Sequence, residues 1–422
     1  MVAGKIIYFD NAATSYPKPE VVYQTQDATL RSAGNPGRGA HRLALDSARA
    51  VFESRSEIAQ FLGIDCPERL VFTPGCTYSI NTILRGFPFR QGDGSSVGRG
   101  KELPTVIASP LEHNAVMRPL NRLEKEGVLR VHRLKYAAGG VIDLRELKEA
   151  VKELKPALCV VQEGSNVTGE LVDINSVWEV CQAAKASLLI DAAQSAGSIP
   201  SCLPQLSASL NATADDGRGF FWCASGHKGL LGPPGIGLLF IGAKSNIEPL
   251  VAGGTGSNSE NLEMPVNYPD RLESGTQPVH LIDALAKGVS WLKQQGIVKL
   301  REHEVALTYR FLAWCDKHSY IKVFGNRTRQ GASTSQEASN RAGLPIVSFT
   351  VNGVSTDQVA DLLDREFDIA VRSGLHCAMA AHQSLGTLKT GLTRASFGYF
   401  NTGDEVDELC KALESIYKKR GQ

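Results

Sequence analysis

The chain has 422 residues, of which 42% are hydrophobic, 21% charged and 7% aromatic. This composition excludes a disordered tail, a disulfide miniprotein and a collagen-like rod, and the length suffices for two domains around a large apolar core. The 45 basic and 44 acidic residues give a formal charge of +1. Like charges form no long run, so nothing favours nucleic acid or an anionic membrane as a partner.

The amino-terminal segment and the cysteines indicate in which cellular compartment the protein is expected. Residues 1–15 lack a basic stretch followed by a long apolar run, and no window reaches the roughly eighteen apolar residues of a membrane helix. We therefore expect a cytoplasmic protein without a membrane segment. The nine cysteines form no C-x-x-C pair, which argues against a disulfide framework and a metal site. Most should be buried thiols, and one can be a nucleophile.

Apolar, β-branched runs alternate with stretches of helical character between residues 70 and 241. The runs are RLVFT, TVIAS, ALCVVQ, SLLID, GFFWCAS and GIGLLFIG. This alternation predicts an α/β protein with a mostly parallel sheet between helices. The first five runs end in polar residues or glycine. Because ligands bind outside the carboxyl ends of the strands in such sheets, we expect these five junctions to face one crevice.

A second pattern begins after residue 267. Residues 278–296 carry apolar side chains at helical spacing, which predicts a long helix leaving the first domain. Residues 344–417 are typical of strand, helix, strand, strand and helix, and predict a smaller α+β domain that closes over the crevice. Two polar stretches rich in glycine and serine, residues 91–104 and 328–343, are expected to be loops.

We predict three parts: an amino-terminal segment, 1–20, that packs with the small domain, a large domain, 21–265, and a connecting helix with the small carboxy-terminal domain, 266–422.

Lys228 and Asp191 each follow an apolar run. Lys228 lies among glycines, where burial can lower the pKa of its amine from about 10.4 and allow a Schiff base near neutral pH. A solvated surface lysine is the alternative. Asp191 ends the run SLLID, and a carboxylate there is unfavourable unless a cation meets it. A protonated pyridine nitrogen is such a cation, and a helix N-cap is the alternative.

Two further turns can contact a cofactor. Residues 73–81 leave a strand and enter an amphipathic helix, so free backbone N–H groups and the Thr77 hydroxyl can bind a phosphate. Turns of this composition also occur without a ligand. His113, in SPLEHNAV, can stack on an aromatic ring and move a proton, and a plain loop histidine is the alternative.

Nine segments resemble, in order, the class V aminotransferase-fold enzymes that use pyridoxal 5′-phosphate (PLP), and are most similar to their cysteine desulfurase and selenocysteine lyase branch. They are YFDNAATSYPKP, NPGRGAH, VFTPGCTYSIN, SPLEHNAV, GSNVTGELVDI, LLIDAAQSAGSIP, SGHKGLLGPPGIG, RLESGT and RSGLHCA. The resemblance runs from about Tyr8 to Thr402. It implies PLP fold type I, with a mostly parallel sheet of the seven-stranded type in the large domain.

The resemblance also implies roles at the cofactor. Lys228 would hold PLP covalently and move protons, Asp191 would pair with the ring nitrogen, and His113 would stack on the ring. The other implied cofactor positions are Gln194 at the phenolic oxygen, Cys76, Thr77, Ser225 and His227 at the phosphate, Asn166 near the ring and substrate, and Thr276 reaching the phosphate from a second subunit. A site completed in this way predicts a homodimer.

Cys377 decides the reaction. It follows a predicted strand beside Arg372 and His376, whose positive charge would favour a thiolate, and a buried structural thiol is the alternative. The resemblance implies that Cys377 attacks the sulfur of bound cysteine and becomes a persulfide, releasing alanine. Arg394 resembles the family arginine that binds the substrate carboxylate through a bidentate contact. The alternative is that Arg394 forms a surface ion pair. Further substrate positions implied are Arg372, His41, Asn11 and Ala13.

The segment between Cys377 and Arg394 is short and resembles the compact-loop cysteine desulfurase family proteins. A short tether requires a sulfur-acceptor protein to approach Cys377. The sequence thus predicts a PLP-dependent cysteine desulfurase acting on L-cysteine or a similar small amino acid. The alternatives are selenocysteine lyase, or a class V transaminase, epimerase or C–S lyase. The combination of Lys228 with Asp191 argues against a binding module without catalysis.

Overall fold

The computed structural model of the protein describes residues 6–37, 39–89, 103–137, 141–210, 219–242, 247–257, 260–325 and 343–420. Apart from residues 103, 104 and 343, the two predicted loops at 91–104 and 328–343 lie outside this part of the chain.

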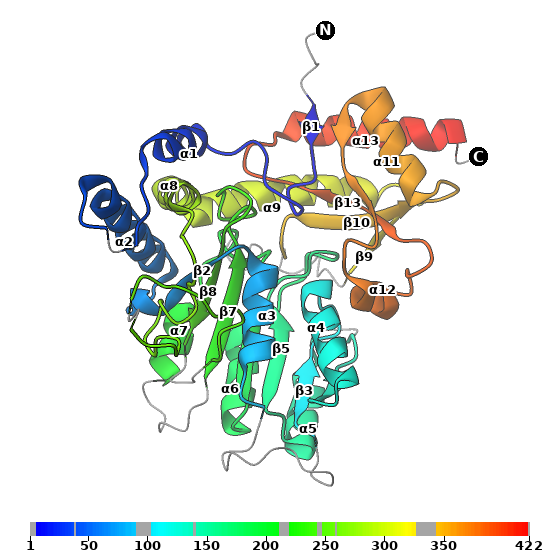
Figure 1. Ribbon diagram of the computed structural model, residues 1–422. Helices are drawn as coiled ribbons and strands as arrows, with labels where there is room; N and C mark the ends of the chain where they lie inside the picture. The colour runs from blue at the N-terminus through cyan, green and yellow to red at the C-terminus, as the bar shows by residue number, and fades with distance from the viewer. Residues whose placement is uncertain are drawn as a thin grey trace.

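Seven strands form the large central sheet in the order β2-β8-β7-β6-β5-β3-β4 (Figure 1). They are β2 (Leu70–Thr73), β3 (Thr105–Ala108), β4 (Arg130–Arg133), β5 (Leu158–Gln162), β6 (Ser187–Asp191), β7 (Phe220–Ser225) and β8 (Gly237–Ile241). Only β8 runs antiparallel to its neighbours, so the predicted mostly parallel sheet is confirmed. Each predicted run forms a strand. The sequence did not reveal β4, because its residues, RVHR, lie at the sheet edge and alternate between exposed and half-buried.

Both faces of this sheet are covered by helices. Successive residues of a strand point to opposite faces, so these apolar strands place hydrophobic side chains on both faces of the sheet. Leu188 and Ile190 join one apolar layer, while Leu189 joins the other. The first layer includes α2 (Arg42–Leu62), α5 (Leu144–Leu154), α6 (Ile174–Ala183), α7 (Leu203–Leu210) and α8 (Val279–Gln295). The second includes α3 (Cys76–Gly86) and α4 (Asn114–Lys125). Helix α1 (Glu20–Ser32) packs on the outside of α8.

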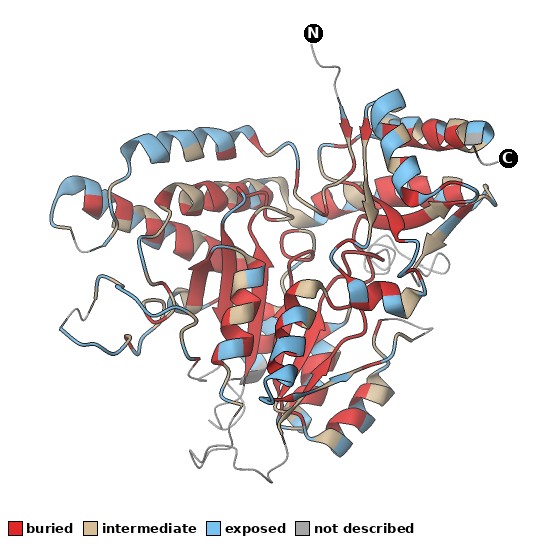
Figure 2. Ribbon diagram, turned by 45° about the vertical axis from the view of Figure 1, so that its right-hand side comes forward, coloured by how far each residue is buried: buried red, intermediate tan, exposed pale blue. Residues whose placement is uncertain are grey.

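The carboxyl ends of β2, β7, β6, β5 and β3 lie at the same edge of the sheet, since β8 alone is reversed. These ends are the five junctions that the sequence places around one crevice. Figure 2 shows that the inner strands of the sheet are buried, while the outward faces of the covering helices are exposed. Polar side chains at the strand ends are therefore held by a rigid buried scaffold.

The second body contains a four-stranded antiparallel sheet in the order β12-β13-β10-β9. Its strands are β9 (Ile321–Phe324), β10 (Ile346–Val351), β12 (Arg372–Gly374) and β13 (Leu392–Ser396). Its helices are α9 (Ile297–Cys315), α11 (Thr356–Phe367), α12 (Met379–Leu385) and α13 (Gly403–Arg420). The predicted strands and helices are present, except that the single strand predicted over 368–374 is divided into β11 (Ile369–Ala370) and β12, and α9, β9 and α12 are additional. The amino-terminal strand β1 (Ile7–Tyr8) pairs in parallel with β11 (Ile369–Ala370) of this body. No helix among the described residues combines the length and apolar character needed to cross a membrane.

Candidate active site

Asp191 ends β6 and is 1% exposed. Its Oδ1 accepts hydrogen bonds from the Ala193 N–H at 2.9 Å and from the Cys76 thiol at 3.5 Å. The predicted alternative is thus partly right, because the carboxylate caps a turn, although no helix follows. Within the described residues no cationic side chain forms an ion pair with Asp191. A buried carboxylate with this partner set suits a protonated pyridine nitrogen.

Lys228 lies three residues beyond β7, partly buried among glycines. Burial lowers the pKa of its amine, an effect opposed by Asp191 and Cys76 and increased by Arg394. Lys228 is therefore not a fully solvated surface lysine. An amine with a lowered pKa beside a buried carboxylate suits attachment of an aldehyde cofactor.

A groove at the sheet edge unites four of the predicted phosphate-binding residues. Cys76 and Thr77, in the first turn of α3, line it together with Ser225 and His227, and its volume is about 910 Å³ including open solvent. The ring Nδ1 of His227 is buried without a hydrogen-bond partner, and burial lowers the pKa of this histidine to about 4. An uncharged ring with an unused nitrogen beside a helix amino terminus fits a phosphate group.

His113 precedes α4 and acts as its N-cap. Its Nδ1 accepts a hydrogen bond from the Ala115 N–H at 3.0 Å, and burial lowers the pKa of its imidazole. His113 therefore has a structural role as a helix cap, in addition to the role expected of it at the cofactor. The capping bond fixes the ring orientation at the end of β3, in the same crevice as Asp191, which influences its titration. The predicted stacking on a cofactor ring stays a proposal.

Residues 375–378, between β12 and α12, form the Cys377 loop. Two hydrogen bonds of 2.8 Å hold this loop to the large domain. The Asn114 N–H donates to the Cys377 carbonyl, and the Asn166 side-chain amide donates to the His376 carbonyl. The Cys377 residue is exposed, unlike a structural core thiol. His376 and Cys377 both adopt left-handed backbone conformations, with φ of 49° and 53°, which are uncommon for residues other than glycine. The loop thus holds the backbone of an exposed cysteine against Asn114, the residue that follows His113.

One expectation about this loop is wrong. His376 is 4% exposed, and burial, aided by Arg394, lowers its pKa to about 2. The ring is therefore neutral and cannot supply the positive charge expected beside Cys377. Arg372, on β12, can still supply positive charge beside Cys377, since it is half-buried and its guanidinium is permanently charged.

Arg394 is only 2% exposed on β13. It donates to the Asn166 carbonyl at 2.9 Å and to Asp10 Oδ1 at 2.8 Å, while its Nε is buried without a partner. The surface ion pair considered from the sequence is therefore excluded. Arg372 stands opposite Arg394 in the β12–β13 ladder, so two guanidinium groups lie on neighbouring strands. This arrangement can attract and orient a small carboxylate.

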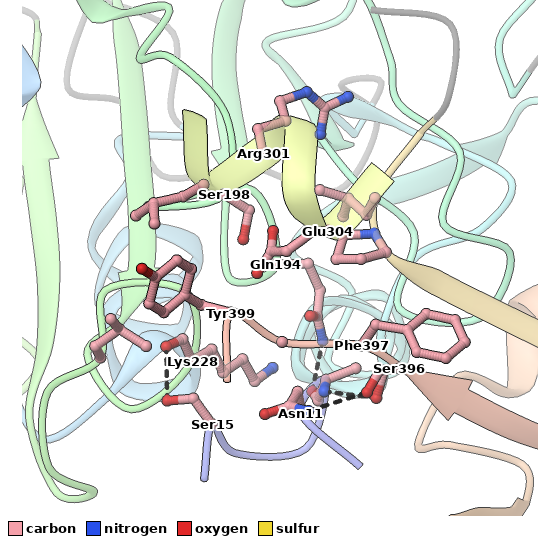
Figure 3. A pocket seen from close by; sticks show the side chains of 18 of the residues that line it. Asn11, Ser15, Gln194, Ser198, Lys228, Arg301, Glu304, Ser396, Phe397 and Tyr399 are labelled. Atoms are coloured by element: carbon pink, nitrogen blue, oxygen red, sulfur yellow. Dashed lines mark hydrogen bonds between the residues drawn. The ribbon is translucent and has the colours of Figure 1, made fainter. Parts of the chain in front are cut away.

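Gln194 and Lys228 also line a pocket of about 680 Å³, including open solvent, between the large domain, α9 and the amino-terminal segment (Figure 3). The Gln194 side-chain amide donates to the Ala12 carbonyl at 2.8 Å, which ties the amino-terminal segment to the sheet edge. Asn11 donates to the Ser396 carbonyl at 3.0 Å. Figure 3 shows the Glu304 carboxylate turned into the same pocket, and burial raises the pKa of Glu304 to about 8.

Three residues that were predicted to contact the cofactor or substrate have other contacts in the structure. His41 is exposed and caps α2 by accepting the Ala44 N–H at 3.3 Å. Thr276 is exposed before α8 and is not among the residues lining the phosphate groove. The Ala13 N–H donates to the Asp10 carbonyl within a turn. The cofactor and substrate contacts expected of these residues stay predictions.

Sequence reasoning missed two acidic residues, Asp10 and Glu112. Asp10 binds Arg394, and Glu112 is fully buried at the β3–α4 turn. Both lie inside motifs that were recognised, next to Asn11 and His113 respectively. The sequence offered one signal for both residues: each is a carboxylate within a motif expected to be buried, and a buried carboxylate requires a hydrogen-bonding or charged partner.

The strand-end lysine, the buried carboxylate and the phosphate groove on this α/β scaffold define a PLP enzyme of fold type I. The chain belongs to the aminotransferase class-V family, whose profile matches residues 7–409. Members of this family use PLP as their cofactor, and the residues at the strand ends fit it.

Curated relatives and solved structures agree with this assignment. A probable cysteine desulfurase of Pyrococcus abyssi is 31% identical over 98% of this chain and 95% of its own length. A protein of the same name from Methanothermobacter thermautotrophicus is 30% identical, covering 97% and 94%. The apo structure of a cysteine desulfurase from Thermococcus onnurineus has a TM-score of 0.81 at 28% identity, covering 98% and 95%.

Proposed function

We propose that the protein is a PLP-dependent cysteine desulfurase that converts L-cysteine to L-alanine and holds the sulfur as a persulfide on Cys377. The observation that carries this proposal is the pair of 2.8 Å hydrogen bonds holding the Cys377 loop to Asn114 and Asn166 at the strand ends. The relatives named cysteine desulfurase support the same reaction.

Residues at and beyond the strand ends would hold the cofactor. Lys228 would bind it, Asp191 would support its ring nitrogen, His113 would cover its ring and Gln194 would contact its phenolic oxygen, while the groove with Cys76, Thr77, Ser225 and His227 would receive its phosphate. When bound, PLP withdraws electrons from the substrate Cα. The Lys228 amine takes a proton from the substrate Cα and returns it, since its lowered pKa makes the neutral form accessible.

Sulfur transfer is the task of Cys377. Its thiolate attacks the substrate sulfur, so that a new S–S bond forms while the Cβ–S bond breaks. The electron pair of the broken bond stays with the substrate Cβ, which takes up a proton, and alanine leaves. Arg394 binds the substrate carboxylate near the Asn166 carbonyl, and Arg372 adds positive charge. A sulfur-acceptor protein then approaches the exposed loop and takes the persulfide sulfur.

A homodimer completes this proposal. The amino-terminal helices α1 and α2 expose large apolar side chains, including Leu30 at 61% and Phe52 at 69%. The others are Val21, Tyr23, Leu43 and Leu45. Such a concentration is typical of a subunit interface. A second subunit seated there brings an exposed Thr276 toward the phosphate groove of its partner. The cytoplasm is the compartment proposed for the enzyme.

Product analysis tests the proposed reaction. The purified holoenzyme is incubated with cysteine, selenocysteine and other small amino acids, and alanine, sulfide, selenide and keto acids are measured. We expect alanine and persulfide from cysteine in the wild type, and neither from Cys377→Ala. The matched control, Cys66→Ala, alters another incompletely buried thiol and should leave turnover unchanged. Full cysteine turnover by Cys377→Ala, or formation of a keto acid, contradicts the proposal.

A further inference from the structure

We infer that Glu112 is a positioning residue that fixes both His113 and the Cys377 loop relative to the central sheet. Its place in the structure is the turn from β3 to α4, where it is 0% exposed. The inference deepens the proposed function and rests on it only for the roles of His113 and Cys377. No contact of Glu112 with substrate or cofactor is involved.

Glu112 replaces a backbone hydrogen bond that the sheet lacks. The last backbone bond from β3 to β5 joins the Ser109 N–H to the Val160 carbonyl at 3.0 Å. Pro110 then turns the chain away, so the next N–H on that side of β5, that of Gln162, has no carbonyl of β3 to reach. Glu112 Oε1 accepts this N–H at 2.8 Å. A buried donor left alone here would be unfavourable.

A second hydrogen bond joins the two ends of the turn, residues 109 and 112. The Ser109 hydroxyl donates to the same Glu112 Oε1 at 2.6 Å. The carboxyl group therefore joins the first residue after β3, the end of β5 and the start of α4 at one oxygen. Burial raises the pKa of Glu112 to about 8, so the group is mainly neutral at pH 7 and avoids the free-energy penalty of a buried charge.

Three consecutive residues then have separate tasks. Glu112 anchors the turn to β5, His113 caps α4 with its ring held at the crevice, and the Asn114 N–H carries the Cys377 carbonyl. Because His113 and Asn114 follow Glu112 directly and are themselves held by these hydrogen bonds, we expect a shift of Glu112 to displace both. The side chain of Gln162 extends the connection, because it contacts Asn166, which holds the His376 carbonyl.

Amide hydrogen exchange of the apo and holo proteins tests this inference. Glu112→Ala should raise exchange by about tenfold or more in residues 109–118 and in residues 373–380, because the lost acceptor releases the turn and with it the Cys377 loop. Glu112→Gln keeps the accepting oxygen and should stay within about twofold of the wild type. In the holoenzyme Glu112→Ala should lower kcat, leave KM nearly unchanged and shift the cofactor absorption maximum.

A matched control lies on α4, the helix that follows Glu112. Glu124 Oε1 accepts the Val131 N–H of β4 at 2.8 Å, so Glu124 is another carboxylate that anchors a strand, but it lies at the end of α4 remote from the crevice. Glu124→Ala should raise exchange near residues 128–134 only. If Glu112→Ala does not fold, Ser109→Ala replaces it and should raise exchange about threefold in the same two segments.

Two results overturn the inference. One is unchanged exchange in residues 373–380 of Glu112→Ala or of its Ser109→Ala substitute. The other is a Glu112→Gln protein as mobile as Glu112→Ala, which would assign the effect to the carboxyl proton instead of the accepting oxygen. Neither result depends on desulfurase turnover, whereas loss of the proposed function would be seen as unaltered cysteine turnover by Cys377→Ala.

Discussion

Arg394 and Asp10 stand 384 positions apart in the chain and form a partly buried ion pair of 2.8 Å. Because Asp10 belongs to the amino-terminal segment and Arg394 to β13, the pair fixes the start of the chain against the small sheet. The second guanidinium nitrogen binds the Asn166 carbonyl of the large domain. One side chain therefore connects all three parts of the proposed substrate site.

Replacement of this arginine should affect substrate binding more than cofactor binding. Arg394→Lys keeps the charge but loses the planar fork, so KM for cysteine should rise by about tenfold or more, while PLP absorbance is retained. Steady-state kinetics and spectra of the purified variant check this. The control is Arg310→Lys, which alters an exposed arginine paired with Asp407 and should leave KM unchanged. An unaltered KM in Arg394→Lys would remove the carboxylate-binding role.

Lys228 should be the residue that reacts with PLP. Borohydride reduction of the holoenzyme followed by peptide mass analysis should find the cofactor on Lys228 in the wild type, and no attachment to Lys228→Ala. Lys18 is a demanding control, because burial also lowers its pKa, to about 8. Lys18→Met should leave the labelling intact, since Lys18 lies outside the proposed cofactor contacts. Label on Lys18 in the wild type would contradict the assignment.

The exposed apolar surface of α1 and α2 should hold the dimer together. Phe52→Glu places a charge on a side chain that is 69% exposed in the single chain, so the variant should be monomeric by light scattering. Its PLP affinity should fall, because Thr276 of a second subunit would no longer reach the phosphate. Val298→Glu, at an apolar residue 45% exposed on α9, should remain dimeric. A dimeric Phe52→Glu with normal affinity would argue against this interface.

The pH dependence of stability should reflect Glu112. Its folded pKa of about 8 lies above the unfolded value of about 4.3, because burial disfavours the charged form. The folded state therefore binds the extra proton, and the free energy of unfolding falls as pH rises between these two values, by at most about 1.4 kcal/mol per unit.

Glu112→Gln cannot ionise, so its stability should decline less than that of the wild type from pH 5 to pH 8. Urea denaturation of both proteins at several pH values measures the difference, which should level off above the folded pKa. Parallel curves for the two proteins would show that Glu112 does not titrate in this way.

The sequence by itself determined the α/β class, the strands of the parallel sheet except β4, and the residues at their carboxyl ends. Local pattern suffices there, because buried strands are apolar runs and each ends where a polar side chain follows. Asp191, Lys228 and Thr77 were singled out for that reason, and Cys76 through the family resemblance. The edge strand β4 lacks the apolar run, since most of it remains in contact with solvent.

Only the tertiary structure decided the electrostatics and the long-range contacts. The neutral state of His376 arises from burial between elements distant in the chain, and no local pattern reports that burial. The hydrogen bond from Asn114 to Cys377 and the ion pair from Asp10 to Arg394 likewise join segments hundreds of residues apart. Chain folding alone sets these distances, and with them the charge and position of each reacting group.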